Sequence, residues 1–160
     1  MRMINGNGRD TITIAHWNGG GSYLCLSDRG KEKLDNIKLL LSEYKLDILG
    51  ISEANLSPQV SSSLYHIEGY NTLIAPGNPS RLVVFIKNNL TYKLRNDLNS
   101  DLAAVWFEVG KFKSKWLICQ YYRQHKVIGT NGSETLIEQN IRFDKFLDTV
   151  SSVPTQTLYL

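Results

Sequence analysis

The chain has 160 residues and a formal net charge of +3, and its 42% hydrophobic and 21% charged residues indicate one ordinary globular domain. It contains no run of about 18 apolar residues and no secretory signal, and Cys25 and Cys119 are too few for a disulfide framework or a cysteine-based zinc site. These features exclude membrane-spanning and disulfide-rich classes, predict an intracellular protein of the nucleus or cytoplasm that is not secreted, and permit a polyanionic partner without requiring one.

The first predicted elements form a strand–helix–strand unit. Residues 11–17 favour a strand because β-branched residues recur there, and residues 31–44 place apolar side chains at the spacing of an amphipathic helix. The apolar run over residues 45–52 suits a strand that is covered on both faces. If both strands share one sheet, they run parallel and end at the same edge. Asn18 and Glu53 stand at those ends, so we expect them to meet.

Later in the chain the pattern changes to short strands. The strands expected over residues 103–109 and 115–122 should pair as a hairpin around a short Gly-containing turn. Further strands are predicted over residues 70–75, 81–87 and 157–160, and a helix over residues 135–151 that Pro154 ends.

The final residues bear on domain organisation, because domains seldom finish inside a core strand. We therefore interpret residues 11–160 as the N-terminal part of one domain, preceded by a disordered leader over residues 1–10. The alternative is an edge strand that simply ends. Loss of later strands would expose apolar faces, so poor solubility or self-association is expected.

Residues able to carry chemistry follow the predicted strands. Glu53 comes directly after a buried strand, where a carboxylate can ligate a hard cation such as Mg²⁺; the alternative is a solvated acid in a loop. Asn18 can orient a phosphate oxygen or a metal-bound water, or it can serve only as a turn residue before three glycines. Tyr122 and Arg123 offer a phenol and a guanidinium for phosphate recognition, or they are an edge aromatic and a surface arginine.

Four segments of the chain match a known set of motifs in order and spacing. They are residues 14–19 (IAHWNG), 47–53 (DILGISE), 81–87 (RLVVFIK) and 118–123 (ICQYYR). Together they resemble the endonuclease/exonuclease/phosphatase superfamily, and in particular the apurinic/apyrimidinic-like endonuclease domain that non-LTR retrotransposons carry beside a reverse transcriptase. The resemblance implies an α/β fold, the DNase I-like αββα sandwich of two mixed sheets with helices outside, incomplete here at the C-terminus.

The resemblance also implies a function: metal-dependent hydrolysis of a phosphodiester in DNA, as an endonuclease domain of a retroelement. Mg²⁺ would be the cofactor, with Mn²⁺ as an alternative. Asn18, Glu53 and Tyr122 would be catalytic, Glu53 would ligate the metal, and Asn18, Tyr122 and Arg123 would bind phosphate. The implied partners are DNA, the C-terminal remainder of the domain and a reverse transcriptase in the parent polypeptide, with no membrane.

The sequence departs from the family pattern in three ways. Gln124 stands where a proline is usual, and Arg81 and Leu82 stand where two glycines are usual, which is expected to change the loop beside that strand. The later Gly-Asp-Phe-Asn-like and Ser-Asp-His-like motifs, which position the attacking water and contact the scissile phosphate, do not occur. The 160 residues alone are therefore expected to have negligible nuclease activity. Two other functions stay open: a phosphatase or phosphodiesterase of this fold acting on lipid or inositol phosphates, and a non-catalytic module that binds nucleic acid or protein.

Overall fold

The computed structural model describes residues 2–4, 11–20, 24, 27–57, 59–77, 79–98, 104–122, 136–153 and 157–159. Within these residues the chain forms two α-helices, one short 3-10 helix and nine strands. In chain order they are β1 (Arg2–Ile4), β2 (Ile14–Asn18), α1 (Asp28–Glu43), β3 (Ile48–Leu56), η1 (Ser62–Tyr65), β4 (Tyr70–Ile74), β5 (Ser80–Lys87), β6 (Thr91–Leu94), β7 (Ala104–Lys111), β8 (Ser114–Tyr121), α2 (Leu136–Ser152) and β9 (Thr157–Tyr159).

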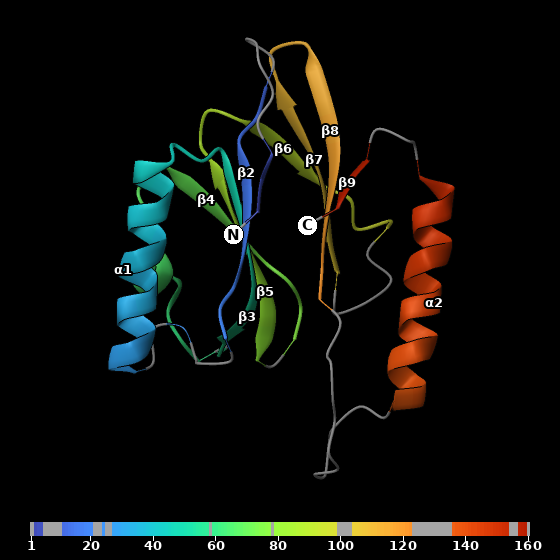
Figure 1. Ribbon diagram of the computed structural model, residues 1–160, viewed down its shortest axis with the longest axis horizontal. Coiled ribbons are helices and arrows are strands. Elements are labelled where there is room, and N and C mark those ends of the chain that lie inside the picture. Colours follow the sequence, from blue (N-terminus) through green and yellow to red (C-terminus); the bar gives the residue numbers. More distant parts are fainter. Residues whose placement is uncertain are drawn as a thin grey trace.

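Two sheets pack face to face between α1 and α2, as Figure 1 shows. In the described residues the first sheet has the strand order β1-β2-β3-β5-β4, and the second has the order β6-β7-β8-β9. Both sheets are mixed, because β2 runs parallel to β3 and β8 runs parallel to β9, whereas the other neighbours are antiparallel. The expected α/β arrangement of two mixed sheets with helices outside is therefore confirmed.

The first helix forms where its N-terminus is capped. The Ser27 side chain accepts a hydrogen bond from the Gly30 N–H at 3.1 Å, and Asp28 adds a negative charge to the first turn. The apolar stripe of α1 is buried against the first sheet; this cluster includes Leu34, Ile37, Leu41, Leu49, Ile51 and Phe85. The helix thereby returns the chain to the start of β3, so that β2 and β3 end at the same edge.

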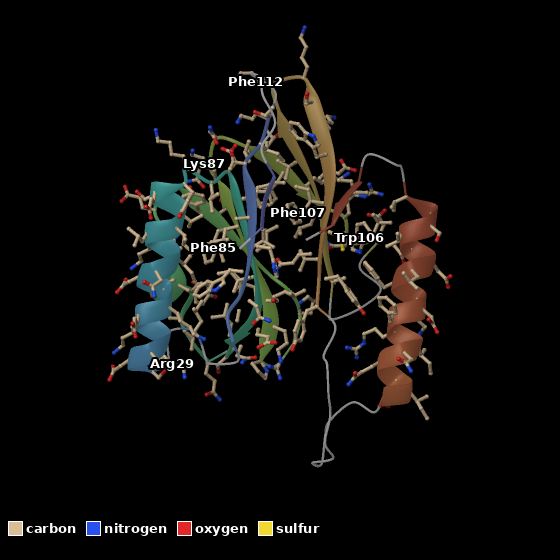
Figure 2. The ribbon with its side chains drawn as sticks, in the orientation of Figure 1. Arg29, Phe85, Lys87, Trp106, Phe107 and Phe112 are labelled. Atoms are coloured by element: carbon tan, nitrogen blue, oxygen red, sulfur yellow. The ribbon has the colours of Figure 1, made fainter. Side chains whose placement is uncertain are left out.

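Apolar layers hold the sheets and helices together. A cluster between the sheets contains Phe107 of β7, and Trp106 on the opposite face of that strand contacts Phe146 of α2, with ring centroids 6.1 Å apart. Figure 2 shows Phe85, Phe107 and Trp106 in succession from the α1 side to the α2 side. The cluster between the sheets includes Ile14, Ile48, Leu82, Val84, Ile86, Val105, Phe107, Val109 and Ile118.

An ion cluster ties the two sheets at the edge where β3 begins. The buried Asp47 carboxylate accepts a hydrogen bond from the Thr13 N–H at 3.0 Å, and its Oδ2 lies 3.1 Å from Lys111 Nζ at the end of β7. The same ammonium donates to the Thr11 carbonyl at 2.7 Å, and Lys87 Nζ lies 3.8 Å from Asp47 Oδ1. One carboxylate from the first sheet thus anchors a lysine from the second. Lys87 and Phe112 mark this edge in Figure 2, whereas Arg29 marks the opposite edge.

The structure corrects two local predictions. Residues 2–4 were expected to belong to a disordered leader, but they pair as β1 with β2; a strand of three residues leaves no recognisable alternation in the sequence. The hairpin turn lies at Phe112 and Lys113, and Gly110 is paired with Lys115 inside the ladder. A Cβ at Gly110 would lie 2.6 Å from Thr91 Oγ1, so glycine permits the close approach of β6 instead of forming the turn.

Besides β1, two elements, η1 and β6, had no counterpart among the predicted ones. The remaining strands and both helices occur where the sequence indicated, with ends shifted by a few residues. Pro154, which was expected to end α2, lies outside the described residues.

Candidate functional site

The C-terminal ends of β2 and β3 bring two predicted site residues together. The strands pair in parallel with Asn18 opposite Ser52, so Asn18 lies next to Glu53. Asn18 Nδ2 donates a hydrogen bond to Glu53 Oε1 at 3.2 Å. The expectation that Asn18 and Glu53 meet at one edge of a sheet is therefore confirmed.

A third predicted residue reaches the same carboxylate from the second sheet. Tyr122 follows the end of β8, and its hydroxyl donates to Glu53 Oε1 at 3.3 Å. Both hydrogen bonds that Glu53 accepts within the described residues fall on Oε1, which leaves Oε2 available to a ligand. Burial and the adjacent Glu53 charge raise the pKa of the Tyr122 phenol, against an opposing effect of Arg81. At neutral pH the phenol is therefore a hydrogen-bond donor.

A bulge in β3 presents Glu53 to this site. Residues 53–55 lie opposite a single residue of β5, Arg81, and the ladder resumes on either side. Glu53 has a φ of 55° and Asn55 a φ of 49°, both in the left-handed region that non-glycine residues seldom adopt. Such backbone is typical of positions where a bulge redirects a side chain.

The bulge also reverses which side chains of β3 face α1. Before it, Leu49 and Ile51 pack in the cluster under α1; Ala54 within the bulge and Leu56 after it do so as well. In a regular strand the odd-numbered Glu53 would continue on the face of Leu49 and Ile51, because side chains alternate with a period of two. The extra residues instead leave its carboxylate free to meet Asn18 and Tyr122.

The turn after β2 fixes the Asn18 side chain. The Gly20 N–H donates to Asn18 Oδ1 at 2.8 Å, which directs Nδ2 toward Glu53. The Gly19 N–H donates to the Ser52 carbonyl at 2.7 Å, and a Cβ at Gly19 would lie 3.2 Å from the carbonyl oxygens of Ser52 and Glu53. Glycine therefore allows this close approach, and Asn18 serves both as a turn residue and as a partner of Glu53.

Two cations flank the site, and the sequence had assigned neither a place in it. Lys33 of α1 donates to the Gly19 carbonyl, and Arg81 of β5 donates to Asn55 Oδ1. Burial lowers the pKa of Lys33; nearby Arg29 lowers it further, and Glu53 opposes the change. No sequence motif marks Lys33 or Asn55. Arg81 was notable as a departure from the family pattern and as one of several basic residues that could help to bind DNA or could simply be solvated. Arg123 lies outside the described residues.

The donor set suits one hard cation. No group of three or more His, Cys, Asp or Glu side chains that could hold a metal occurs within the described residues. Mg²⁺, however, keeps several waters and is often bound through one or two carboxylates together with substrate phosphates. Glu53, with Oε2 available, fits such a site, and the Asn18 amide beside it can bind a phosphate oxygen or a metal-bound water.

Comparison with solved structures identifies the fold. The endonuclease domain of TRAS1, a telomere-specific non-LTR retrotransposon, superposes with a TM-score of 0.58 at 12% identity over 91% of this chain and 56% of its own. An AP endonuclease from Archaeoglobus fulgidus gives a TM-score of 0.59 at 13% identity over 90% of this chain and 53% of its own. The 3′ phosphatase NExo from Neisseria, bound to a product DNA hairpin, gives 0.55 at 16% identity over 88% and 51%.

These likenesses establish a DNase I-like fold, which is the fold that the sequence motifs implied. The chain spans a little over half the length of these structures. No family model and no curated protein matches the sequence. Among the described residues, neither helix is long and apolar enough to cross a membrane.

Proposed function

We propose that this chain carries the Glu53 site of a metal-dependent phosphodiesterase that acts on DNA, as part of the endonuclease domain of a retroelement. One observation carries the proposal: Asn18 from the first sheet and Tyr122 from the second sheet both donate a hydrogen bond to the same oxygen, Glu53 Oε1. In the parent polypeptide the proposed partners are the remainder of the domain and a reverse transcriptase.

Each side chain has a task that follows from its contacts. Glu53 would hold the divalent ion, and a bound Mg²⁺ would neutralise phosphate charge and stabilise the leaving oxygen. Asn18 and Tyr122 orient the Glu53 carboxylate through Oε1. Because its pKa is raised, the Tyr122 phenol keeps its proton and can donate it in a hydrogen bond to a phosphate oxygen.

The charges around the site support an anionic substrate. Lys33 and Arg81 flank Glu53 and donate to neutral partners, the Gly19 carbonyl and the Asn55 amide. Phosphate contacts of this kind supply most of the affinity of proteins for DNA. The structural neighbour NExo is bound to a product DNA hairpin, which supports DNA as the substrate that we propose for this chain.

The proposal is tested by the anisotropy of a labelled DNA duplex, titrated with the chain at constant ionic strength with and without Mg²⁺. Screening alone makes Mg²⁺ weaken DNA binding, so tighter binding with Mg²⁺ reports a bridging ion. We expect this tightening, and we expect Tyr122→Phe to reduce it about 10-fold, as for a lost charge-assisted hydrogen bond. Tyr44→Phe, at the far end of α1, is the matched control.

Weaker binding with Mg²⁺, equal in wild type and Tyr122→Phe, would contradict the proposal. Displacement of the metal by a chelator should return the affinity to its value without Mg²⁺. Competition by a soluble inositol phosphate that exceeds competition by unlabelled DNA would instead favour the phosphatase alternative.

Catalysis is a separate question from binding. We expect the 160 residues to nick supercoiled plasmid negligibly in Mg²⁺, because within the described residues neither Asn18 nor Tyr122 nor the flanking cations can accept a proton from water as a general base. Gel electrophoresis of the plasmid measures the nicked fraction. Turnover that Glu53→Ala abolishes would show that these residues suffice for the reaction.

A further inference from the structure

Arg81 lies at an irregular position of β5, where the pairing with β3 is interrupted. It lies alone opposite the three bulged residues 53–55, at the point where β3 and β5 separate. Its guanidinium donates to Asn55 Oδ1, and Asn55 itself is buried. The bulge that presents Glu53 therefore also supplies the contact that holds Arg81.

No carboxylate in the described part of the chain neutralises the Arg81 charge. Within the described residues Arg81 forms no ion pair, and its identified partner, the Asn55 amide, is neutral. A guanidinium has five N–H donors in a planar fork that matches phosphate geometry. The side chain is partly exposed, so donors beyond the one used by Asn55 can reach a ligand.

Arg81 also lies beside the proposed ligand site. It faces the bulged residues 53–55 across the sheet, and Glu53 is the first of these residues. Tyr122 contacts Glu53 Oε1 from the second sheet. Arg81 therefore flanks Glu53 on the β5 side.

We propose that Arg81, held by Asn55 across the β3 bulge, is a substrate-binding residue that takes a non-bridging oxygen of the phosphate bound at Glu53. The inference rests on the proposed function and deepens it, because it adds a fixed cationic contact that selects for a phosphate group. Asn55 is the positioning residue: it orients the guanidinium without neutralising it.

Three variants test this assignment in the same DNA titration with Mg²⁺ present. Arg81→Gln should weaken binding about 10- to 100-fold, as for a lost charge-assisted hydrogen bond, and lower the slope of log affinity against log salt by about 1. Arg81→Lys should recover part of the affinity, because a lysine keeps the charge but not the fork. Lys45→Gln removes one positive charge from an exposed side chain that follows α1 and precedes the start of β3, at the edge away from the site; it is the matched control and should change the affinity far less.

The third variant, Asn55→Asp, distinguishes an effect on DNA affinity from an effect on the stability of the fold. A carboxylate in place of the amide keeps the acceptor for Arg81 but pairs with its charge, so DNA affinity should fall while the thermal midpoint is kept or raised. In a double-mutant cycle the effect of Asn55→Asp should shrink when Arg81→Gln is already present.

The outcomes distinguish the two proposals. If wild type shows no tightening with Mg²⁺, the proposed function fails, and the assignment of Arg81 fails with it. If wild type tightens as expected but Arg81→Gln keeps both the affinity and the salt slope of wild type, only the assignment of Arg81 is wrong. Loss of thermal stability in Arg81→Gln together with wild-type affinity in Asn55→Asp would show that Arg81 only holds the bulge.

Discussion

Glu53→Gln is expected to abolish the Mg²⁺-dependent part of DNA binding while the fold is kept. Glutamine preserves the shape of the side chain and an oxygen that can accept from Asn18 and Tyr122, but it removes the charge that attracts the ion. Residues that only support a metal ligand cost about 10- to 100-fold in metal affinity when changed, so loss of the ligand itself should exceed about 100-fold. Isothermal titration with Mg²⁺ or Mn²⁺ measures this directly.

In the same variant, the DNA affinity should change in opposite directions with and without Mg²⁺. Without Mg²⁺, Glu53→Gln should bind DNA slightly more tightly than wild type, because a negative charge near the phosphates is removed. Glu43→Gln, at the exposed end of α1, changes the net charge equally and should leave the Mg²⁺ effect intact. A Glu53→Gln variant that retains wild-type Mg²⁺ affinity would refute Glu53 as the ligand.

Phe107→Ala should produce the largest loss of stability. Phe107 is fully buried between the two sheets. Removing its ring leaves a cavity that is lined by side chains of both sheets. Substitutions of buried phenylalanine by alanine cost about 3–5 kcal/mol in the free energy of unfolding. In a chain of this length that corresponds to a fall in the thermal midpoint of roughly 6–20 °C. Urea unfolding followed by tryptophan fluorescence measures the change.

Phe112→Ala is the matched control for the same deletion of atoms. Phe112 lies in the turn of the hairpin that contains Phe107, but its side chain is 80% exposed. The free energy of unfolding should change by no more than about 0.5 kcal/mol. Equal losses in the two variants would mean that the space between the sheets is not the main apolar core.

Much of the fold was predictable because its signals are local and periodic. The apolar spacing of α1 and the buried runs of β3 and β5 are patterns of single elements, and parallel pairing of β2 with β3 follows from the helix between them. That pairing was enough to predict that Asn18 and Glu53 meet. The contact of Tyr122 with Glu53 was not predicted: the resemblance implied that both residues are catalytic, but their contact depends on how the two sheets pack.

The remaining features depend on backbone geometry that periodicity does not report. The β3 bulge places residues 53–55 opposite Arg81, whereas the sequence pattern predicted that the strand ends at Ser52. Because the bulge is invisible in the pattern, the sequence could not indicate that Asn55 holds Arg81. Phe112 in the hairpin turn is a similar case: its φ of 55° is a conformation typical of Gly or Asn, and no residue preference marks it.

The two sheets are fastened unequally at their two ends. At one edge the buried Asp47 carboxylate forms an ion pair of low exposure with Lys111, whereas at the other edge, within the described residues, a hydrogen bond between the Tyr122 phenol and the Glu53 carboxylate joins the sheets. A ligand that displaces this hydrogen bond is therefore expected to loosen the contact between the sheets at the Tyr122 end, while the Asp47–Lys111 ion pair holds the other end.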